Sequence, residues 1–140
     1  MKQTTSIIEP SFALDTNILI HLQGNDASKR KIAETLMSCD PIIPAQVVME
    51  FINVTRRLRK IPKKQLIEEA SALFRHCWIV PVEQSTLNLA KNLIDIYDFQ
   101  IFDSIVVAAS IEANCTILYS EDMQHNLLVV EQLKIINPYI

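Results

Sequence analysis

The chain has 140 residues, of which 49% are hydrophobic, and these values predict one domain, residues 1–140, with a core of its own. It has no apolar run of about 18 residues and it starts with the polar segment MKQTT, so we expect a cytoplasmic protein without a membrane span or a secretion signal. The net charge of -3 gives no overall attraction to nucleic acid, and the single glycine, Gly24, excludes glycine-rich phosphate loops.

In the first half of the chain, short apolar segments alternate with helical patterns. Residues 11–14 read as a short strand, and residues 18–22 as the start of a helix. Helical spacing of apolar residues then predicts a helix at 27–39. The segment 41–44 is short and bounded by prolines, which favours a strand, and residues 45–60 place their apolar side chains on one helix face.

The second half repeats this alternation after Pro62, which ends the preceding helix. We expect, in chain order, a helix at 63–76, a strand at 78–80, a helix at 84–97, a helix at 104–113 that Asp103 opens, and strands at 116–119 and 133–136. Short strands separated by helices of about ten or more residues favour right-handed crossovers. We therefore predict an α/β fold in three layers, with a mainly parallel sheet of four or five short strands and helices on both faces.

Four acidic residues stand where an apolar segment ends or where an apolar helix face should continue: Asp15, Glu50, Asp103 and Asp122. Ligands of open parallel sheets bind outside the carboxyl ends of the strands, and Asp15 and Asp122 both follow predicted strands. Asp103 faces the same edge if the winding is regular. A fold that gathers these carboxylates needs a compensating cation, for which a divalent metal is the natural choice. The pattern indicates metal-assisted phosphodiester hydrolysis.

Each acid also has a structural explanation. Asp15 and Asp103 could cap the helices that follow them, and Asp122 could be an ordinary turn residue. Taken singly, these explanations are the better ones. Glu50 is harder to explain in this way, because it lies within an apolar helical segment, although a structural glutamate could point to solvent. The four acids together favour a site.

A basic run occupies the end of the predicted helix at 45–60 and continues beyond Pro62: Arg56, Arg57, Arg59, Lys60, Lys63 and Lys64. Positive surface beside an acidic pocket suits a phosphate backbone, so Arg56, Arg57, Arg59 and Lys60 are candidate contacts to the backbone of a nucleic acid. A charge run on an amphipathic helix is more often its solvated face, and that alternative stays open.

Four segments resemble the acidic motifs of PIN-domain nucleases. They are residues 13–20 (ALDTNILI), 44–51 (PAQVVMEF), 102–109 (FDSIVVAA) and 118–123 (LYSEDM). The resemblance runs in order over nearly the whole chain, from about residue 12 to residue 137. In size and motif order the chain is similar to the VapC-like toxins of toxin–antitoxin pairs.

The resemblance implies a role for each matching residue. Asp15, Glu50, Asp103 and Asp122 would be the catalytic, metal-binding carboxylates, and Thr16, Asn17, Ser120 and Glu121 their polar neighbours. Because Glu121 doubles the acid of the last motif, either it or Asp122 could be the fourth ligand. The resemblance also implies a ribonuclease that depends on Mg²⁺ or Mn²⁺, forms a homodimer and is inhibited by an antitoxin segment in the acidic groove.

Two other functions compete with this one. An acidic pocket on a parallel sheet also suits aspartyl phosphotransfer, but haloacid-dehalogenase-like domains need a second Asp two residues after the first, and that position holds Asn17. A non-catalytic nucleic-acid-binding PIN-like module is the other alternative. The histidines, His21, His76 and His125, are isolated in sequence, which favours surface or packing roles over general bases.

Overall fold

The structure is a computed structural model that describes residues 11–140. Within this range the central sheet has six strands: β1 (Phe12–Leu14), β2 (Ile42–Pro44), β3 (Trp78–Val80), β4 (Ile117–Tyr119), β5 (Leu128–Val129) and β6 (Leu133–Ile136). Their order across the sheet is β3-β2-β1-β4-β6-β5. The strands pair in parallel except β5, which runs antiparallel to β6. The predicted α/β fold with a mainly parallel sheet is confirmed, with β5 as an additional strand.

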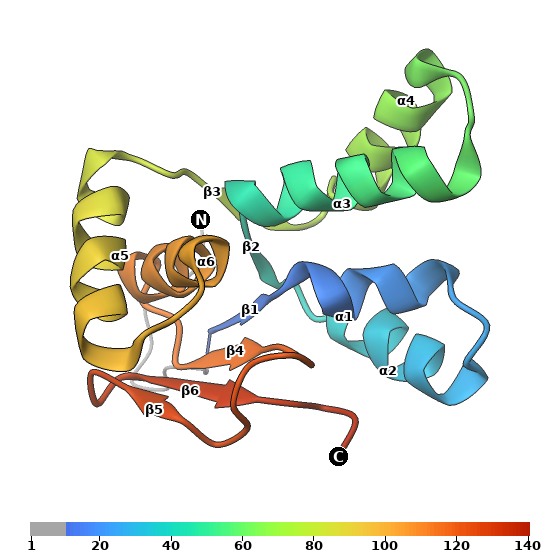
Figure 1. The fold of residues 1–140 in the computed structure, drawn as a ribbon. Helices are drawn as coiled ribbons and strands as arrows, with labels where there is room; N and C mark the ends of the chain where they lie inside the picture. Colours follow the sequence, from blue (N-terminus) through green and yellow to red (C-terminus); the bar gives the residue numbers. More distant parts are fainter. Residues whose placement is uncertain (1–10) are drawn as a thin grey trace, which may run out of the picture.

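The helices are α1 (Thr16–Ile20), the 3₁₀ turn η1 (His21–Gln23), α2 (Ala27–Met37), α3 (Ala45–Arg59), α4 (Lys63–Leu73), α5 (Gln84–Tyr97) and α6 (Ile101–Glu112). Figure 1 shows α5 and α6 packed together beside the sheet. The pair α1 and α2 and the pair α3 and α4 extend on the side where the strands end, and α1 contacts α3. None of the helices described over residues 11–140 is long and apolar enough to cross a membrane.

The core forms around β1, β4, β6 and α6. Leu14, Leu118 and Ile135 are fully buried on the three neighbouring strands. Helix α6 is apolar over most of its surface and buries six of its residues, as expected of a helix enclosed by other elements. Helix α3 instead buries Val47, Phe51 and Thr55, which are four residues apart and share one face. Its opposite face is left for solvent or for ligands.

The start of α6 differs from the prediction. The helix begins at Ile101, with Gln100 at its N-cap, so Asp103 lies inside the first turn instead of opening the helix. The expectation that Asp103 caps this helix is therefore wrong. Two exposed apolar residues, Ile101 and Phe102, lie in the first turn of α6, ahead of the predicted start of the helix. An acid in the first turn is still favoured by the helix dipole.

Candidate active site

Asp15 and Ser120 lie side by side because β1 and β4 are parallel neighbours. Leu14 pairs with Tyr119 in the register of the two strands, and the N–H of Asp15 donates to the carbonyl of Tyr119 at 3.0 Å. Asp15 and Ser120, which follow the last residues of these strands, therefore leave the sheet at the same edge. The Oγ of Ser120 donates to Oδ2 of Asp15 at 2.9 Å.

Asp15 is buried, with 5% of its surface exposed. Its Oδ1 accepts the N–H of Thr16 at 2.8 Å, so it is also the N-cap of α1. Burial raises the pKa of Asp15 to about 6, against the opposing hydrogen bonds from Ser120 and Thr16, and the negative charges of Asp103 and Glu50 add to this rise. Asp15 therefore both caps α1 and carries a buried carboxylate whose charged form is disfavoured.

Glu50 and Asp103 belong to the same acidic group. Glu50 is half-buried on α3, and its Oε1 accepts the hydroxyl of Thr16 at 3.2 Å. Burial raises the pKa of Glu50, with a further contribution from Asp103. Burial also raises the pKa of Asp103, with a further contribution from Asp122. The four predicted acids therefore lie within electrostatic reach of one another, and three of them are destabilised as anions.

Asn17 connects the two ends of the site. Its Nδ2 lies 3.3 Å from Oδ2 of Asp15, 3.3 Å from Oγ of Ser120 and 3.3 Å from Oδ2 of Asp122. Its Oδ1 accepts the N–H of Glu121 at 2.9 Å. One amide side chain thus ties the first motif to the last, more than 100 residues away in sequence.

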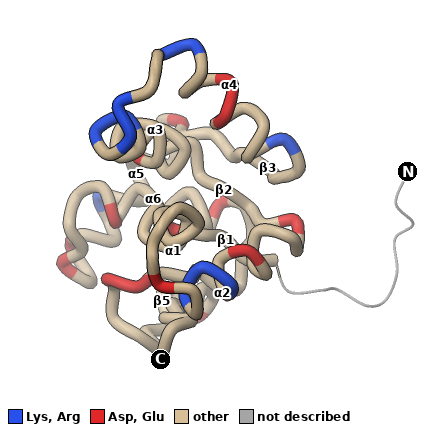
Figure 2. The backbone as a smooth tube through the Cα atoms, turned by 90° about the vertical axis from the view of Figure 1, so that its right-hand side faces the viewer, with Lys and Arg blue, Asp and Glu red and all other residues tan. Residues whose placement is uncertain are grey.

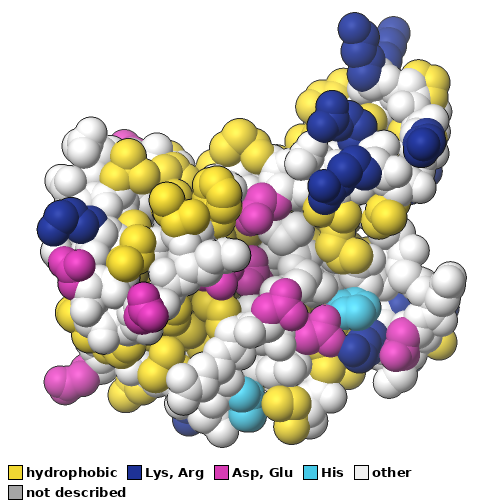
Figure 3. All heavy atoms as spheres, viewed as in Figure 1, with side chains coloured by type: hydrophobic (Ala, Val, Ile, Leu, Met, Phe, Trp, Pro, Cys, Tyr) yellow, Lys and Arg dark blue, Asp and Glu magenta, His cyan; other side chains and the backbone are white. Residues whose placement is uncertain are grey.

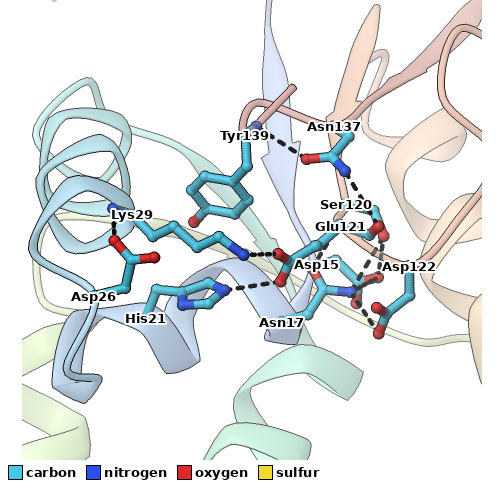
Figure 4. Close-up of polar contacts among 10 residues, drawn as sticks. All are labelled: Asp15, Asn17, His21, Asp26, Lys29, Ser120, Glu121, Asp122, Asn137 and Tyr139. Atoms are coloured by element: carbon cyan, nitrogen blue, oxygen red, sulfur yellow. Dashed lines mark hydrogen bonds and ion pairs between the residues drawn. The ribbon is translucent and has the colours of Figure 1, made fainter.

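The two adjacent acids of the last motif point to different surroundings (Figure 4). Glu121 accepts hydrogen bonds from Nζ of Lys29 at 2.6 Å and pairs with Nε2 of His21 at 2.8 Å. Although burial opposes ionisation, these two partners lower the pKa of Glu121 below its usual value. Asp122 remains beside Asn17 and near Asp103. This arrangement favours Asp122 over Glu121 as the fourth member of the acidic group, and it reveals His21 and Lys29 as neighbours that no sequence motif indicated.

The donor set fits a hydrated hard cation. Among residues 11–140, none of the four acids forms an ion pair with Lys, Arg or His. Within that same range, no group of three or more His, Cys, Asp or Glu side chains is placed so that it could hold a metal ion directly. Mg²⁺ keeps several waters and takes one or two direct carboxylates, so an open set of oxygen donors with uncompensated charge suits it. Mn²⁺ accepts the same oxygen donors.

The basic run lies at the tip of the α3–α4 arm, residues 45–73. Arg56, Arg57 and Lys60 are exposed there, and Arg59 forms an ion pair with Glu69 of α4. Figure 2 shows this positive segment at one end of the molecule. Figure 3 shows acidic side chains gathered in the recess between this arm and the α5–α6 region. Positive and negative surfaces are therefore separated but lie on the same face.

An apolar groove, which the sequence did not indicate, runs between η1 and the α3–α4 arm. It has a volume of about 440 Å³ and is lined mainly by Leu22, Phe51, Leu66 and Leu73. The side chain of Gln23 bridges its two walls by donating to Oγ1 of Thr55 at 2.9 Å.

Three solved structures share this fold. A toxin–antitoxin complex from Klebsiella pneumoniae contains a chain with a TM-score of 0.69 and 19% identity, over 92% of this chain and 98% of that one. The toxin VapC20 of Mycobacterium tuberculosis, which cleaves the sarcin-ricin loop, has a TM-score of 0.61 and 15% identity over 77% of this chain and 87% of its own. VapBC2 from Rickettsia felis, bound to a fragment of promoter DNA, has a TM-score of 0.66 and 15% identity, over 90% of this chain and 98% of that one.

No curated protein matches the chain in sequence. The family model of the PIN domain matches residues 12–128, which include all four acidic segments. The resemblance drawn from the motifs is thereby confirmed at the level of the family. The chain belongs to the PIN domain family of nucleases.

Proposed function

We propose that this protein is a metal-dependent ribonuclease that hydrolyses RNA phosphodiester bonds, with residues 1–140 acting as one PIN-like domain. The observation that carries the proposal is the convergence of Asp15, Glu50, Asp103 and Asp122 at one edge of the sheet without a positive partner among the described residues. Carboxylates that lie close together and repel one another are typical of a functional site that binds a cation.

In this proposal the four acids hold Mg²⁺ or Mn²⁺. When bound, such an ion makes water a stronger nucleophile and stabilises the charge that develops on the phosphate. The hydroxyl of Ser120 and the amide of Asn17 fix the orientation of Asp15, and the hydroxyl of Thr16 fixes Glu50. These neighbours restrict the carboxylates to one arrangement, which is the requirement for efficient positioning of substrate and water.

The basic tip of the α3–α4 arm supplies attraction for the RNA backbone. Glu50 and Arg57 are seven residues apart on α3, which corresponds to about 10 Å along the helix. One RNA strand can therefore span both the acidic recess and the positive tip. Arg57, Arg56 and Lys60 provide charge for phosphate groups, whereas Arg59 is engaged by Glu69.

We further propose that the enzyme is the toxin of a type II toxin–antitoxin pair and that it forms a homodimer. The solved structures with the same fold include toxin–antitoxin complexes. The apolar groove beside the α3–α4 arm suits an apolar segment of an antitoxin, whose adjacent residues could reach the acidic recess. Exposed apolar residues on β3, α5 and α6, such as Trp78, Leu87 and Phe102, offer a surface for a second copy.

The decisive experiment incubates the purified protein with a mixed pool of single-stranded RNA in EDTA, in Mg²⁺ and in Mn²⁺. Cleavage in either metal but not in EDTA is the expected result. Asp95→Asn is the matched control for variants of the four acids, because Asp95 is an exposed acid of α5 that pairs with Lys91 at 3.6 Å. Absence of cleavage by the wild type in both metals would overturn the proposal. Labelling of Asp15 by acetyl phosphate would instead indicate phosphotransfer.

A further inference from the structure

A second polar cluster lies directly behind the acidic site and involves residues outside the four motifs. His21, Lys29 and Glu121 are its members, and each side chain is between one fifth and about one third exposed. The Glu121 carboxylate uses both oxygens: Oε1 pairs with His21 at 2.8 Å and Oε2 with Lys29 at 2.6 Å. Figure 4 shows the two side chains reaching Glu121 from α2 and from η1.

Glu121 is also the central residue of the segment that carries the last motif. This segment, residues 120–122, follows β4 and has no regular secondary structure. The N–H of Glu121 donates to Oδ1 of Asn17 at 2.9 Å, and its carbonyl accepts from Nδ2 of Asn137 at 3.4 Å. Side chain, N–H and carbonyl of one residue are therefore all held. Its neighbours, Ser120 and Asp122, are the two residues of the segment that face the acidic site.

The two side-chain partners of Glu121 are themselves fixed. Asp26 caps α2 and accepts the N–H of Lys29 at 3.1 Å, which places Lys29 in the first turn of that helix. The ring of Tyr139 packs edge-to-face on His21 at 4.9 Å between centroids, and Nζ of Lys29 lies 5.2 Å from the centre of the same ring. Contacts with Tyr139 and the cap of α2 thus help to hold His21 and Lys29 in place beside Glu121.

We propose that His21 and Lys29 are positioning residues for the metal-binding site. They fix Glu121, and Glu121 in turn holds Asn17 and the segment 120–122 where Asp15 and Asp122 are oriented for the cation. The inference rests on the proposed function, because it assigns these residues a role in the same site. It adds a contribution from α2 and η1 that the four acidic motifs do not contain.

A second effect of the cluster is electrostatic. Lys29 neutralises a carboxylate that immediately precedes Asp122 in the chain. Without Lys29, the Glu121 carboxylate would keep only His21 as a side-chain partner and would be held less firmly beside Asp122. Changes to residues that orient ligands typically lower metal affinity by about 10- to 100-fold. Because Lys29 and His21 act through another residue, an effect of about tenfold is expected.

The test measures Mn²⁺ binding by isothermal titration calorimetry, without RNA, for the full-length wild type, Lys29→Met and His21→Asn. Both variants should bind Mn²⁺ about tenfold more weakly. In cleavage assays the Mn²⁺ concentration that gives half of the maximal rate should rise about tenfold. The KM for RNA at saturating metal should be unchanged. Lys29→Arg should restore binding, since it keeps the charge. Lys31→Met, an exposed lysine two residues away on α2, is the control for lost charge.

A further variant separates positioning from general destabilisation. In a Glu121→Gln background, Lys29→Met should cause little additional loss of Mn²⁺ affinity, because both changes interrupt the same contact. Wild-type Mn²⁺ affinity and half-activation in both Lys29→Met and His21→Asn would overturn the inference while the proposed function stands. If the wild type neither binds Mn²⁺ nor cleaves RNA, the proposed function fails first, and the inference fails with it.

Discussion

Two neighbouring regions of this protein place their acids in opposite surroundings. The site carboxylates, Asp15, Glu50, Asp103 and Asp122, have no positive partner within the described range, and burial raises the pKa of the first three. Glu121 precedes Asp122 directly, yet its hydrogen bonds to Lys29 and His21 outweigh burial and lower its pKa. Two adjacent residues of one loop thus differ. Asp122 belongs to the uncompensated group, which is the four site acids. Glu121 belongs to the compensated group, which it forms with His21 and Lys29.

This difference separates a binding role from a structural one. An acid whose charge is balanced by the chain itself contributes to stability, whereas acids that repel one another lower stability until a cation arrives. In the proposed function, the charge that remains unbalanced is the place where the external ion binds. The comparison can be tested by neutralising members of each group separately.

The largest effect is expected from Asp15→Asn and Asp103→Asn. Each change removes one oxygen anion from the proposed metal site, so RNA cleavage should fall below detection. The fold should persist, because asparagine is also a good N-cap at position 15 and because one repulsive charge is lost. Cleavage of a labelled RNA and circular dichroism measure the two properties. Wild-type cleavage by either variant would contradict the assignment.

The metal-free protein should also lose stability as the pH rises. A folded pKa of about 6 for Asp15, against 3.8 ordinarily, means that its protonated form favours folding. This contribution is complete below about pH 4 and is lost as the pH rises through 6, which amounts to about 3 kcal/mol. Glu50 and Asp103 shift in the same direction.

Urea unfolding in EDTA at pH 5 and at pH 7 measures this decline, and Asp15→Asn is the comparison that isolates the contribution of Asp15. The variant should lose less stability than the wild type between the two pH values. Saturating Mn²⁺ at pH 7 should recover the stability of the wild type but not that of the variant. Identical pH slopes for the two proteins would contradict the assigned burial of charge.

A smaller pair of effects should differ in sign. Glu50→Gln should raise the unfolding free energy of the metal-free protein at pH 7 by less than about 1 kcal/mol, because it removes a charge from the repulsive group at a position that solvent still screens. Glu121→Gln should lower it by about 1 kcal/mol, because it weakens two charge-assisted hydrogen bonds at a partly exposed position. The stabilising contribution of Glu121 is present above its unfolded pKa and is lost as the pH falls. Changes of the same sign would show that the two groups do not differ.

Sequence periodicity was sufficient for most of the fold. The strands β1, β2, β3, β4 and β6 and all the long helices are found close to the predicted ranges, since their apolar residues repeat at the expected spacing. Strand β5 has only two residues, too few for a periodic signal. The turn that joins it to β6 uses Val130 and Glu131 with positive φ values of 43° and 57°, where an Asn-Gly pair would have been recognisable.

The acidic site was predictable because parallel strands end at the same edge of a sheet, which brings Asp15 and Asp122 together from opposite ends of the chain. The partners of Glu121 were not. Lys29 lies 92 residues away from it and His21 lies 100 residues away, and neither belongs to a motif. Long-range pairing of surface charges leaves no local pattern in a sequence, so the division into two acidic groups emerged only from the structure.

The smallest effect is expected at Tyr139, behind the compensated group. Its hydroxyl is buried and has no hydrogen-bond partner among residues 11–140, and burial, with Glu121 and Asp26 nearby, raises its pKa to about 12. The ring, by contrast, packs on His21 and Lys29. Tyr139→Phe keeps the ring and loses no such hydrogen bond, so the unfolding free energy and Mn²⁺ affinity should change by less than about 0.5 kcal/mol.

Tyr139→Leu is the matched variant, because it removes the aromatic face that Lys29 and His21 contact. It should weaken Mn²⁺ binding in the same direction as Lys29→Met, by a smaller factor, when both are measured by calorimetry. If Tyr139→Phe instead lost as much Mn²⁺ affinity as Tyr139→Leu, the phenol hydroxyl would be the group that orders Lys29 and His21. The compensated group would then depend on a polar contact to Tyr139, and packing against its ring would not be what holds Lys29 in place.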